Sequence, residues 1–221
     1  MEILKASEIL KAYSKPVLKG ASLTVSQNEC IGIVGRNGCG KSTLLAILSG
    51  GIKADGGNVS ICCEDAFADR RVFSKYVGYM PQNDPLIEEL SVKDNLKLWY
   101  SIAKRPLDNS IIEKMGLKEV LNKRVSTLSG GMKRRVNMAG ALASGSRLLI
   151  LDEPSTGLDI LCRQEMNELY RAYTNDGGAI IMATHSREEM DICTRLLLLD
   201  DGVLKEIDSR ISMDELANMM K

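Results

Sequence analysis

The chain has 221 residues, of which 44% are hydrophobic and 26% charged, and its 29 basic and 29 acidic residues cancel. This length and composition are typical of one globular domain, and the zero net charge argues against a protein that coats nucleic acid. No uncharged stretch approaches the ~18 residues of a membrane helix, and the first residues lack the apolar core of a signal peptide. The six cysteines show no C-x-x-C spacing. We therefore expect a cytosolic protein with reduced thiols.

Short apolar runs alternate with helical patterns along the chain. Residues 30–34, 147–151 and 179–183 are almost wholly apolar, as in parallel strands buried on both faces. The segments before residue 30 and around 59–61 are more polar and rich in turn residues, which predicts an N-terminal antiparallel β region. Residues 196–204, with Asp-Gly in the middle, predict a hairpin. The predicted fold is α/β with a mostly parallel sheet.

Helical patterns dominate from residue 83 to residue 134. Ser91 is followed by an acid three residues later, which is the pattern of a capped helix start. Apolar residues then recur at helical spacing until Pro106, which is expected to stop the helix. Ser212 is expected to cap a last helix in the same way. We interpret residues 83–134 as a helical lobe inserted into the α/β core.

A glycine-rich segment follows the first buried strand. Residues 35–42 read GRNGCGKS and fit the pattern G-x-x-x-x-G-K-[ST], between a predicted strand and a helical run. Glycines let backbone N–H groups approach phosphate oxygens, and the helix N-terminus adds partial positive charge. Lys41 would supply a full charge at the β- and γ-phosphates, and the Ser42 hydroxyl would ligate Mg²⁺. A chance match is on the order of one in a hundred. The segment therefore predicts a nucleoside triphosphate site made by Gly35, Asn37, Gly38, Cys39, Gly40, Lys41, Ser42 and Thr43.

Two consecutive carboxylates follow the strand predicted at residues 147–151. Ligands bind at the carboxyl ends of parallel strands, so Asp152 is placed to hold Mg²⁺ and Glu153 to orient and deprotonate the attacking water. A strand that ends in solvated acids is a common alternative. The phosphate-binding segment upstream favours the catalytic interpretation.

A second run of small residues lies between these two motifs. Residues 128–132 read LSGGM and precede a helical run, which predicts another anion-binding helix N-terminus, although Ser129 could simply cap that helix. With this motif the chain resembles, over essentially its whole length, the nucleotide-binding domain of ATP-binding cassette (ABC) transporters. Residues 35–42, LSGGM and Leu151–Pro154 are similar to the Walker A, signature and Walker B motifs of that family, in order and spacing.

Other short segments extend the resemblance. Pro81-Gln82 is similar to the Q-loop, residues 155–159 to the D-loop, and Thr184-His185-Ser186 to the switch-histidine loop. Tyr13 stands where the family has an aromatic that stacks on adenine, although it could be a surface or packing residue. The resemblance implies a P-loop NTPase core of residues 1–82 and 135–221, with residues 83–134 as the inserted helical subdomain of one 221-residue domain.

The resemblance also implies residue roles. Two domains would form a head-to-tail dimer around two ATP molecules, so that Ser129, Gly130 and Gly131 of one chain contact the γ-phosphate held by Lys41 of the other. The implied catalytic residues are Glu153, His185, Lys41 and Gln82, and the implied Mg²⁺ ligands are Ser42, Gln82 and Asp152. His185 is the single histidine of the chain. A lone histidine is more often structural, but its place directly after an apolar strand favours the catalytic role.

Two positions depart from the family pattern. Met132 replaces the usual glutamine of the signature, and we expect it to weaken a contact without abolishing ATP binding. The run that it opens resembles a subgroup of bacterial exporters. Cys39 replaces a small or polar residue. It could be a tolerated small side chain, or a thiol near a helix N-terminus whose alkylation blocks ATP hydrolysis unless ATP is bound.

The resemblance implies an ATPase subunit that powers transport, export rather than import, through a separate membrane-spanning permease. Such a subunit would lie on the cytoplasmic face of the membrane and work with a second ABC ATPase chain, identical or different, and the helical lobe would grip the permease. No nucleic-acid partner is expected. The alternatives are a soluble ABC-type ATPase that acts on ribosomes or DNA, and a nucleotide-binding regulator without turnover. The transported substrate cannot be inferred from these residues.

Overall fold

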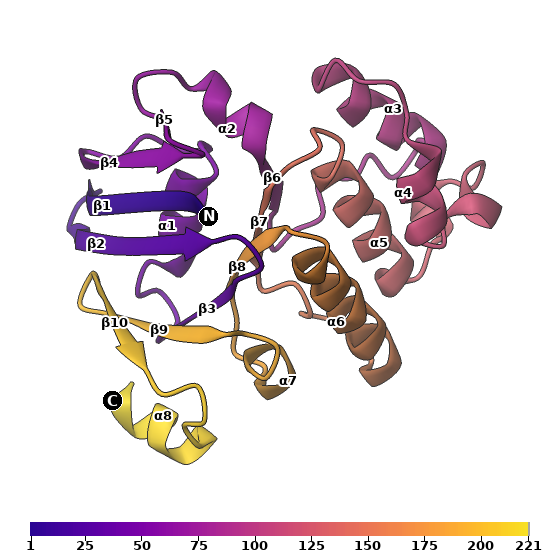
Figure 1. Cartoon of the computed structure of the whole chain (residues 1–221). Helices are drawn as coiled ribbons and strands as arrows, with labels where there is room; N and C mark the ends of the chain where they lie inside the picture. The colour runs from indigo at the N-terminus through magenta and orange to yellow at the C-terminus, as the bar shows by residue number, and fades with distance from the viewer. Residues whose placement is uncertain (221) are drawn as a thin grey trace.

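A six-stranded sheet runs through the middle of the protein, in the strand order β10-β9-β3-β8-β7-β6. The computed structural model describes residues 1–220 (Figure 1). Neighbouring strands are parallel except for the terminal hairpin of β9 and β10. The strands are β3 (Cys30–Val34), β6 (Val77–Met80), β7 (Leu148–Asp152), β8 (Ala179–Ala183), β9 (Arg195–Asp200) and β10 (Val203–Ile207). The predicted mostly parallel sheet is confirmed, and β7 starts one residue later than predicted.

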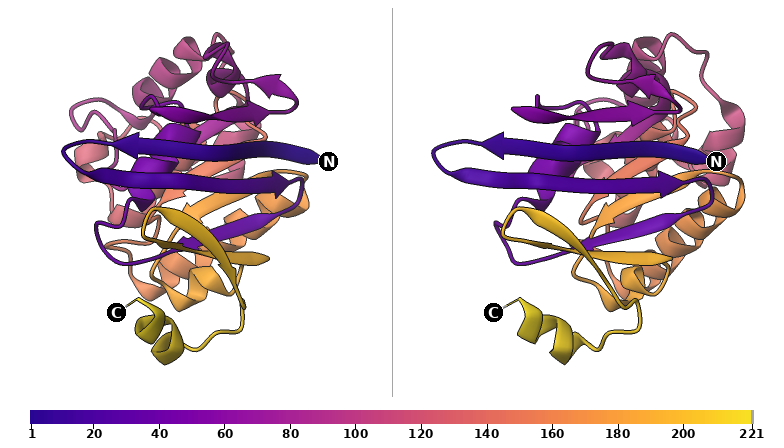
Figure 2. Two further views of the ribbon diagram at one scale, coloured as in Figure 1. Left: turned by 90° about the vertical axis from the view of Figure 1, so that its left-hand side faces the viewer. Right: turned by 60° about the vertical axis from the view of Figure 1, so that its left-hand side comes forward.

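A second sheet covers one side of the first and is antiparallel, as predicted (Figure 2). Its order is β2-β1-β4-β5, from β1 (Glu2–Ala12), β2 (Pro16–Ser26), β4 (Gly56–Ile61) and β5 (Glu64–Asp65). The predicted β9–β10 hairpin is also present. Its two-residue turn places Asp201 at φ 45° and Gly202 at φ 78°, the left-handed conformations that this tight turn requires.

Eight α-helices surround the sheets in the described part of the chain. They are α1 (Lys41–Leu48), α2 (Arg71–Tyr76), α3 (Val92–Ile102), α4 (Asn109–Lys114), α5 (Gly130–Ala141), α6 (Ile160–Asn175), α7 (Arg187–Met190) and α8 (Met213–Met219). Short 3₁₀ turns occupy Lys118–Val120 and Val125–Thr127. None of the helices within residues 1–220 is both long and apolar enough to cross a membrane.

Side-chain caps mark the starts of several helices. Ser91 accepts a hydrogen bond from the Asp94 backbone N–H at 3.1 Å, and Ser212 forms a reciprocal capping box with Glu215, so both predicted starts are confirmed. α3 ends at Ile102, before Pro106. α5 is unbroken from Gly130 to Ala141, so the boundary that we placed after residue 134 falls inside a helix. We define the helical lobe below as α3 to α5, residues 92–141.

The six-stranded sheet is buried on both faces, which explains its apolar strands. Successive side chains of a strand point to opposite faces. Leu148 and Ile150 of β7 accordingly join the apolar cluster shared with α1 and the antiparallel sheet. Leu149 and Leu151 join the cluster shared with α5 and α6. The sheet therefore holds its strand ends at fixed positions between two cores.

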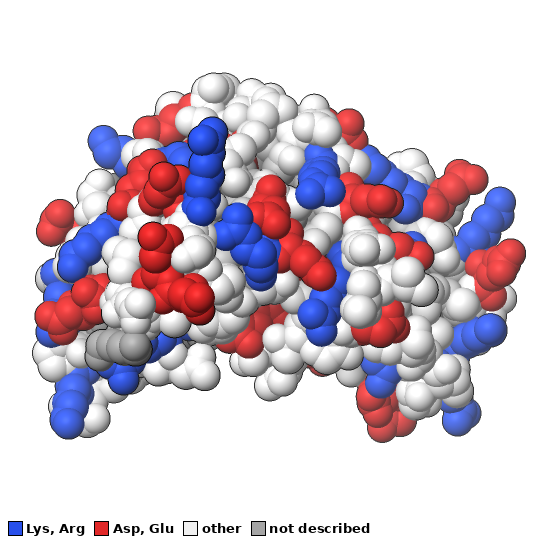
Figure 3. Space-filling view, turned by 90° about the horizontal axis from the view of Figure 1, so that it is seen from below, with Lys and Arg blue, Asp and Glu red and all other residues white. Residues whose placement is uncertain are grey.

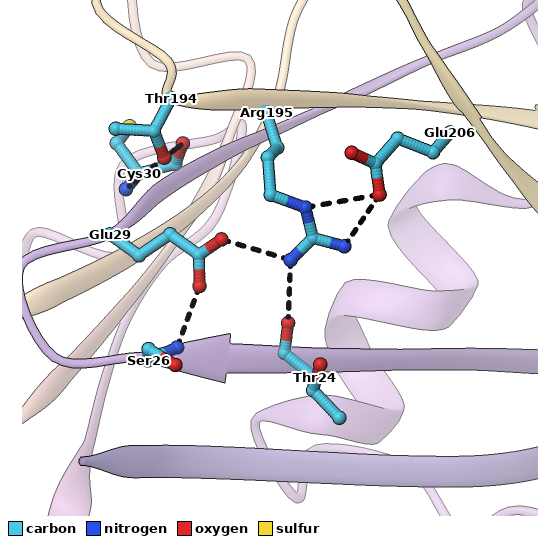
Figure 4. A network of polar contacts seen from close by, with 7 residues as sticks. All are labelled: Thr24, Ser26, Glu29, Cys30, Thr194, Arg195 and Glu206. Atoms are coloured by element: carbon cyan, nitrogen blue, oxygen red, sulfur yellow. Dashed lines mark hydrogen bonds and ion pairs between the residues drawn. The ribbon is translucent and has the colours of Figure 1, made fainter.

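A polar network anchors the start of β3, the strand that leads to the glycine-rich loop (Figure 4). Arg195 of β9 donates to Glu206 of β10 at 2.8 Å, to Glu29 at 2.9 Å and to the carbonyl oxygen of Thr24 at 3.3 Å. Glu29 in turn accepts from the Ser26 backbone N–H. This guanidinium therefore ties the antiparallel sheet to the parallel one beside β3.

Candidate nucleotide-binding site

The glycine-rich segment forms a loop between β3 and α1, as the motif predicted. The residue before α1, Gly40, has φ 110°, and a Cβ there would lie 2.7 Å from Cγ1 of Val17, so glycine is required. The Lys41 ammonium folds back over the loop. It donates to the carbonyl oxygens of Gly35 at 2.9 Å and Arg36 at 3.2 Å. A buried cation thus lies inside a turn of backbone at a helix N-terminus, an arrangement suited to phosphate.

One pocket brings together most of the predicted phosphate-binding and catalytic residues. Its lining consists of Val17, Asn37, Gly38, Gly40, Lys41, Ser42, Thr43, Gln82, Glu153 and His185. Five segments meet there, and four of them follow β3, β6, β7 and β8, whose carboxyl ends lie at the same edge of the sheet because these strands are parallel. Val17, from β2, was not predicted, since an apolar residue in an antiparallel strand gives no sign of a ligand site.

The two consecutive carboxylates point to different partners. Asp152, the last residue of β7, is only 4% exposed and accepts a hydrogen bond from the Ser42 hydroxyl. Burial raises the pKa of Asp152, and the Ser42 hydroxyl and the Lys41 ammonium oppose that rise. Glu153 follows at φ 47°, a left-handed conformation that is strained for a non-glycine residue. The backbone thus turns sharply between the two carboxylates.

Glu153 is surrounded by polar groups from two other loops. Its Oε2 accepts from the Gln82 side-chain amide at 3.0 Å and from the Thr156 hydroxyl at 3.2 Å. Its Oε1 lies 3.7 Å from Nε2 of His185. The carboxylate is therefore oriented on both oxygens, with an amide on one side and an imidazole on the other.

His185 reaches the pocket from the loop after β8. Burial and the nearby Lys41 ammonium lower the pKa of His185, and the Glu153 carboxylate partly offsets this. The imidazole is therefore neutral at neutral pH, with one ring nitrogen that donates and one that accepts. A neutral imidazole can bond both to a phosphate oxygen and to a water molecule.

The LSGGM motif lies outside this pocket. Ser129 caps α5 by accepting from the Met132 backbone N–H at 3.3 Å, which is the role that we weighed as an alternative. Gly131 packs on Cys162 at the start of α6, and Ser129 and Gly130 are exposed. The motif is therefore a surface-exposed helix N-terminus next to the segment at residues 155–159.

Four other predicted ligand residues are not among those that line the pocket: Gly35, Asp152, Tyr13 and Cys39. Tyr13 is 62% exposed at the end of β1, and the Lys11 ammonium lies 5.5 Å from the centre of its ring. Cys39 is half-buried, and its thiol packs on the apolar core beside Gly35. This placement favours the tolerated small side chain. The roles of Tyr13 and Cys39, and the effect of alkylation, stay predictions.

Comparison with known proteins agrees with this geometry. Residues 18–156 match the family model described as ABC transporter. The Nod factor export ATP-binding protein I of Rhizobium etli is 37% identical over 210 residues, which are 91% of this chain and 66% of that protein. The linearmycin resistance ATP-binding protein LnrL of Bacillus subtilis is 32% identical over 221 residues, 96% of this chain and 70% of that protein.

The fold is shared with solved structures at lower identity. The ATP-binding subunit of an ABC transporter superposes with a TM-score of 0.83 at 23% identity and covers 99% of both chains. A dimeric ATP-binding cassette in a post-hydrolysis state with ADP and Pi superposes with a TM-score of 0.84 at 24% identity, over 95% of this chain and 100% of the other.

The fold and the pocket define a P-loop nucleotide-binding domain. The chain belongs to the ABC transporter family, in the part that binds ATP. It spans 66% and 64% of the length of two Nod factor export relatives that it matches.

Proposed function

We propose that the chain is the ATP-binding and hydrolysing subunit of a transporter that works through a separate membrane-spanning permease. The observation that carries the proposal is the position of Glu153. It lies in the pocket with Lys41, its carboxylate is held by Gln82, and the His185 imidazole is adjacent. This arrangement supports a general base for water next to a phosphate-binding loop.

The chain's own residues can carry out most of the reaction. Lys41 and the backbone N–H groups of the loop hold the β- and γ-phosphates, and His185 bonds to a γ-phosphate oxygen. Glu153 orients a water molecule in line with the γ-phosphorus and accepts its proton. Gln82 keeps the Glu153 carboxylate facing that water. The intact set of Lys41, Asp152, Glu153 and His185 argues against a regulator without turnover.

Mg²⁺ fits the residues at the base of the pocket. Ser42 and Asp152 already contact each other, and the Gln82 amide oxygen is a third hard donor nearby. Asp152 is buried, so a divalent cation would offset the cost of its negative charge. Bound there, the ion would neutralise charge that develops on the phosphate oxygens.

Dimerisation gives the LSGGM motif a role. In a head-to-tail pair, Ser129, Gly130 and Gly131 of one chain would complete the pocket of the other. Ser129 and Gly130 are exposed at the helix N-terminus, which suits an anion and lies outside the chain's own pocket. Tyr13 would lie over the adenine. Either an identical or a different ABC chain can supply the second half.

An apolar groove supports the permease partner. It lies between α3, α5 and β6 and is lined by residues that include Pro85, Trp99, Ile102 and Gly140. Ile102 is 73% exposed at its rim. We assign the groove to a short helix from a membrane-spanning partner, because the loop from β6 to α3 connects the groove directly to Gln82. One group of relatives is named for Nod factor export, which supports export as the direction of transport. A subunit that takes ATP for an exporter would lie on the cytoplasmic face.

Co-purification tests the proposal. Tagged Glu153→Gln, expressed in the native host and loaded with ATP and Mg²⁺, should recover a polytopic membrane protein in stoichiometric amount from detergent-solubilised membranes. Adding Ile102→Glu should reduce that recovery at least about tenfold, since a charge would be buried in the interface. The control Met213→Glu, at another exposed apolar position on α8, should leave it unchanged. Recovery of ribosomes or nucleic acid instead would favour the soluble alternative.

A further inference from the structure

Arg134, in the second turn of α5, is a buried arginine whose Nη1 and Nη2 atoms donate hydrogen bonds to one loop. Its side chain is 5% exposed and forms an ion pair with Asp84, Nη1 to Oδ1, at 2.9 Å. The same Nη1 donates to the Pro81 carbonyl oxygen at 3.2 Å, and Nη2 donates to the Gln82 carbonyl oxygen at 2.8 Å. One guanidinium thus holds the backbone of Gln82, whose side chain holds Glu153.

The loop that Arg134 holds has no regular secondary structure between the end of β6 and α3. Its conformation therefore depends on such side-chain bonds. The planar guanidinium fork can serve a carboxylate and two carbonyl oxygens at once, whereas a lysine ammonium is a compact charge on a flexible stem. The site thus calls for arginine in particular.

The same cluster reaches the apolar groove on its other side. Asn137, one turn further along α5, donates to the same Asp84 oxygen at 2.9 Å and also lines the groove. Pro85, directly after Asp84, lines the groove as well. Near the start of α5, Lys133 pairs with Glu88 at 2.6 Å. The Arg134–Asp84–Asn137 cluster therefore lies between the groove and the Gln82–Glu153 hydrogen bond.

We propose that Arg134 is a positioning residue for ATP hydrolysis. It fixes the Gln82 amide against Glu153. Because Arg134 also binds Asp84 beside the groove, a movement of the groove residues would move Gln82 with them. The second half rests on the proposed function, because it describes how a groove partner regulates the ATP site. A ligand at either end then biases the same element, so the coupling is reciprocal.

The next residue, Arg135, is a matched control. It is also an arginine of α5 with a largely buried side chain, 20% exposed. Its guanidinium pairs with Glu165 of α6 at 2.6 Å and donates to the Met115 carbonyl oxygen at 3.2 Å, away from the loop at Gln82. A lysine at either position keeps the charge and loses the fork. Arg134→Lys therefore loosens the loop at Gln82, whereas Arg135→Lys loosens the contacts to Glu165 and Met115.

Steady-state kinetics on the purified full chain tests the first half. For Arg134→Lys we expect kcat to fall about tenfold while the KM for ATP changes less than about twofold, because misplaced catalytic groups lower kcat and the phosphate loop is untouched. Arg135→Lys should keep both constants within about twofold of the parent. Thermal melting must show both variants folded. A kcat of Arg134→Lys equal to that of Arg135→Lys overturns the positioning role.

Trp99 tests the second half without turnover. It is the single tryptophan of the chain, it lines the groove, and a Cβ on Gly140 of α5 would lie 1.4 Å from its ring. In the Glu153→Gln chain, ATP with Mg²⁺ should shift the Trp99 emission. Arg134→Lys should reduce that shift at least about twofold, and Arg135→Lys should leave it unchanged. An emission that ATP does not change, or a full shift in Arg134→Lys, overturns the link to the groove.

The two proposals fail in different ways. A parent chain that binds ATP but never hydrolyses it, alone or on membranes, contradicts the proposed function, and the Trp99 measurement then still decides whether Arg134 links the groove to the ATP pocket. A parent that hydrolyses ATP with Arg134→Lys at the parental kcat contradicts the inference alone.

Discussion

The pocket edge of the sheet and the helical lobe are held in the protein by different forces. At the pocket edge, Ile33 pairs with Ala183 and Ala183 with Asp152. The loops after β3, β8 and β7 therefore begin at strands that are hydrogen-bonded to one another and buried between two apolar cores. The helical lobe also packs apolar residues, but polar side chains such as Arg134 set its link to the loop after β6.

This difference determines how firmly each region is held. Moving a ladder between two close-packed cores breaks several hydrogen bonds and opens cavities, which costs many kcal/mol. Basic and acidic side chains are interspersed over the face of the molecule seen from below (Figure 3). The partly exposed Lys133–Glu88 pair between α5 and the loop contributes about 0–1 kcal/mol, whereas the buried Arg134–Asp84 pair costs more to break. The strand ends that carry the loops after β3, β7 and β8 are therefore held more firmly than the loop after β6, which side-chain contacts hold.

The largest effect should come from the pocket edge of the sheet. Glu153→Gln should lower the ATP hydrolysis rate by roughly 10²–10⁴, the usual contribution of a general base, while ATP binding persists. The variant should also accumulate as an ATP-bound dimer, measured by size-exclusion chromatography with ATP and Mg²⁺. The control is Glu188→Gln, an exposed glutamate three residues after His185, which should keep the parental rate. A Glu153→Gln chain that stays monomeric at saturating ATP would contradict the sandwich.

An intermediate effect should come from overpacking the lobe. Gly140→Ala places a Cβ 1.4 Å from Cε3 of Trp99, so either the Trp99 ring or helix α3 must move. Helix propensity favours alanine by about 1 kcal/mol, but the clash is larger, and we expect a net loss of about 1–3 kcal/mol in the free energy of unfolding. Urea unfolding measures it. In a Trp99→Leu background the same change should cost less, and an equal cost in both backgrounds would rule out this contact as the cause.

The smallest effect concerns pH. The folded-state pKa of His185 is lowered, so the unfolded chain binds a proton first as the pH falls below about 6.5. The neutral imidazole therefore stabilises the folded chain above that pH, and the stabilisation is lost as the pH falls toward the folded pKa. Urea unfolding at pH 7.5 and 5.5 should show a larger loss in the parent than in His185→Gln. Because the imidazole is 41% exposed, the difference should be small, and a larger loss in His185→Gln would reverse the assigned direction.

The sequence predicted the buried strands and the glycine-rich loop better than the contacts between loops, for physical reasons. Strands buried on both faces must be apolar throughout, so Cys30–Val34 and Ala179–Ala183 were predicted with their observed bounds. The phosphate loop needs glycines at set positions, and these are visible as a motif. The hydrogen bond between Gln82 and Glu153, by contrast, depends on how two distant loops meet.

Arg134 shows the limit most clearly. Within the run Lys133-Arg134-Arg135 it looks like part of a solvated basic face. It is buried only because the loop at residues 81–84 folds over it, and no periodic pattern marks that loop. The left-handed backbone of Glu153 was equally invisible, since glutamate gives no sign of that conformation. Local patterns describe elements, whereas these features arise between elements.

The place of β6 at the end of the strand order gives the molecule a gradient of local stability. β6 pairs with β7 on one side, and within the described chain no strand of its sheet lies on the other. An edge strand can open by losing a single ladder, whereas β3 and β8 would lose two. Opening from the β6 edge would therefore release the loop at Gln82 before it reaches β3 and the Lys41 loop, while β10 forms the other edge of the sheet. Such an opening would leave the Lys41 loop intact while the Gln82 amide is displaced from Glu153.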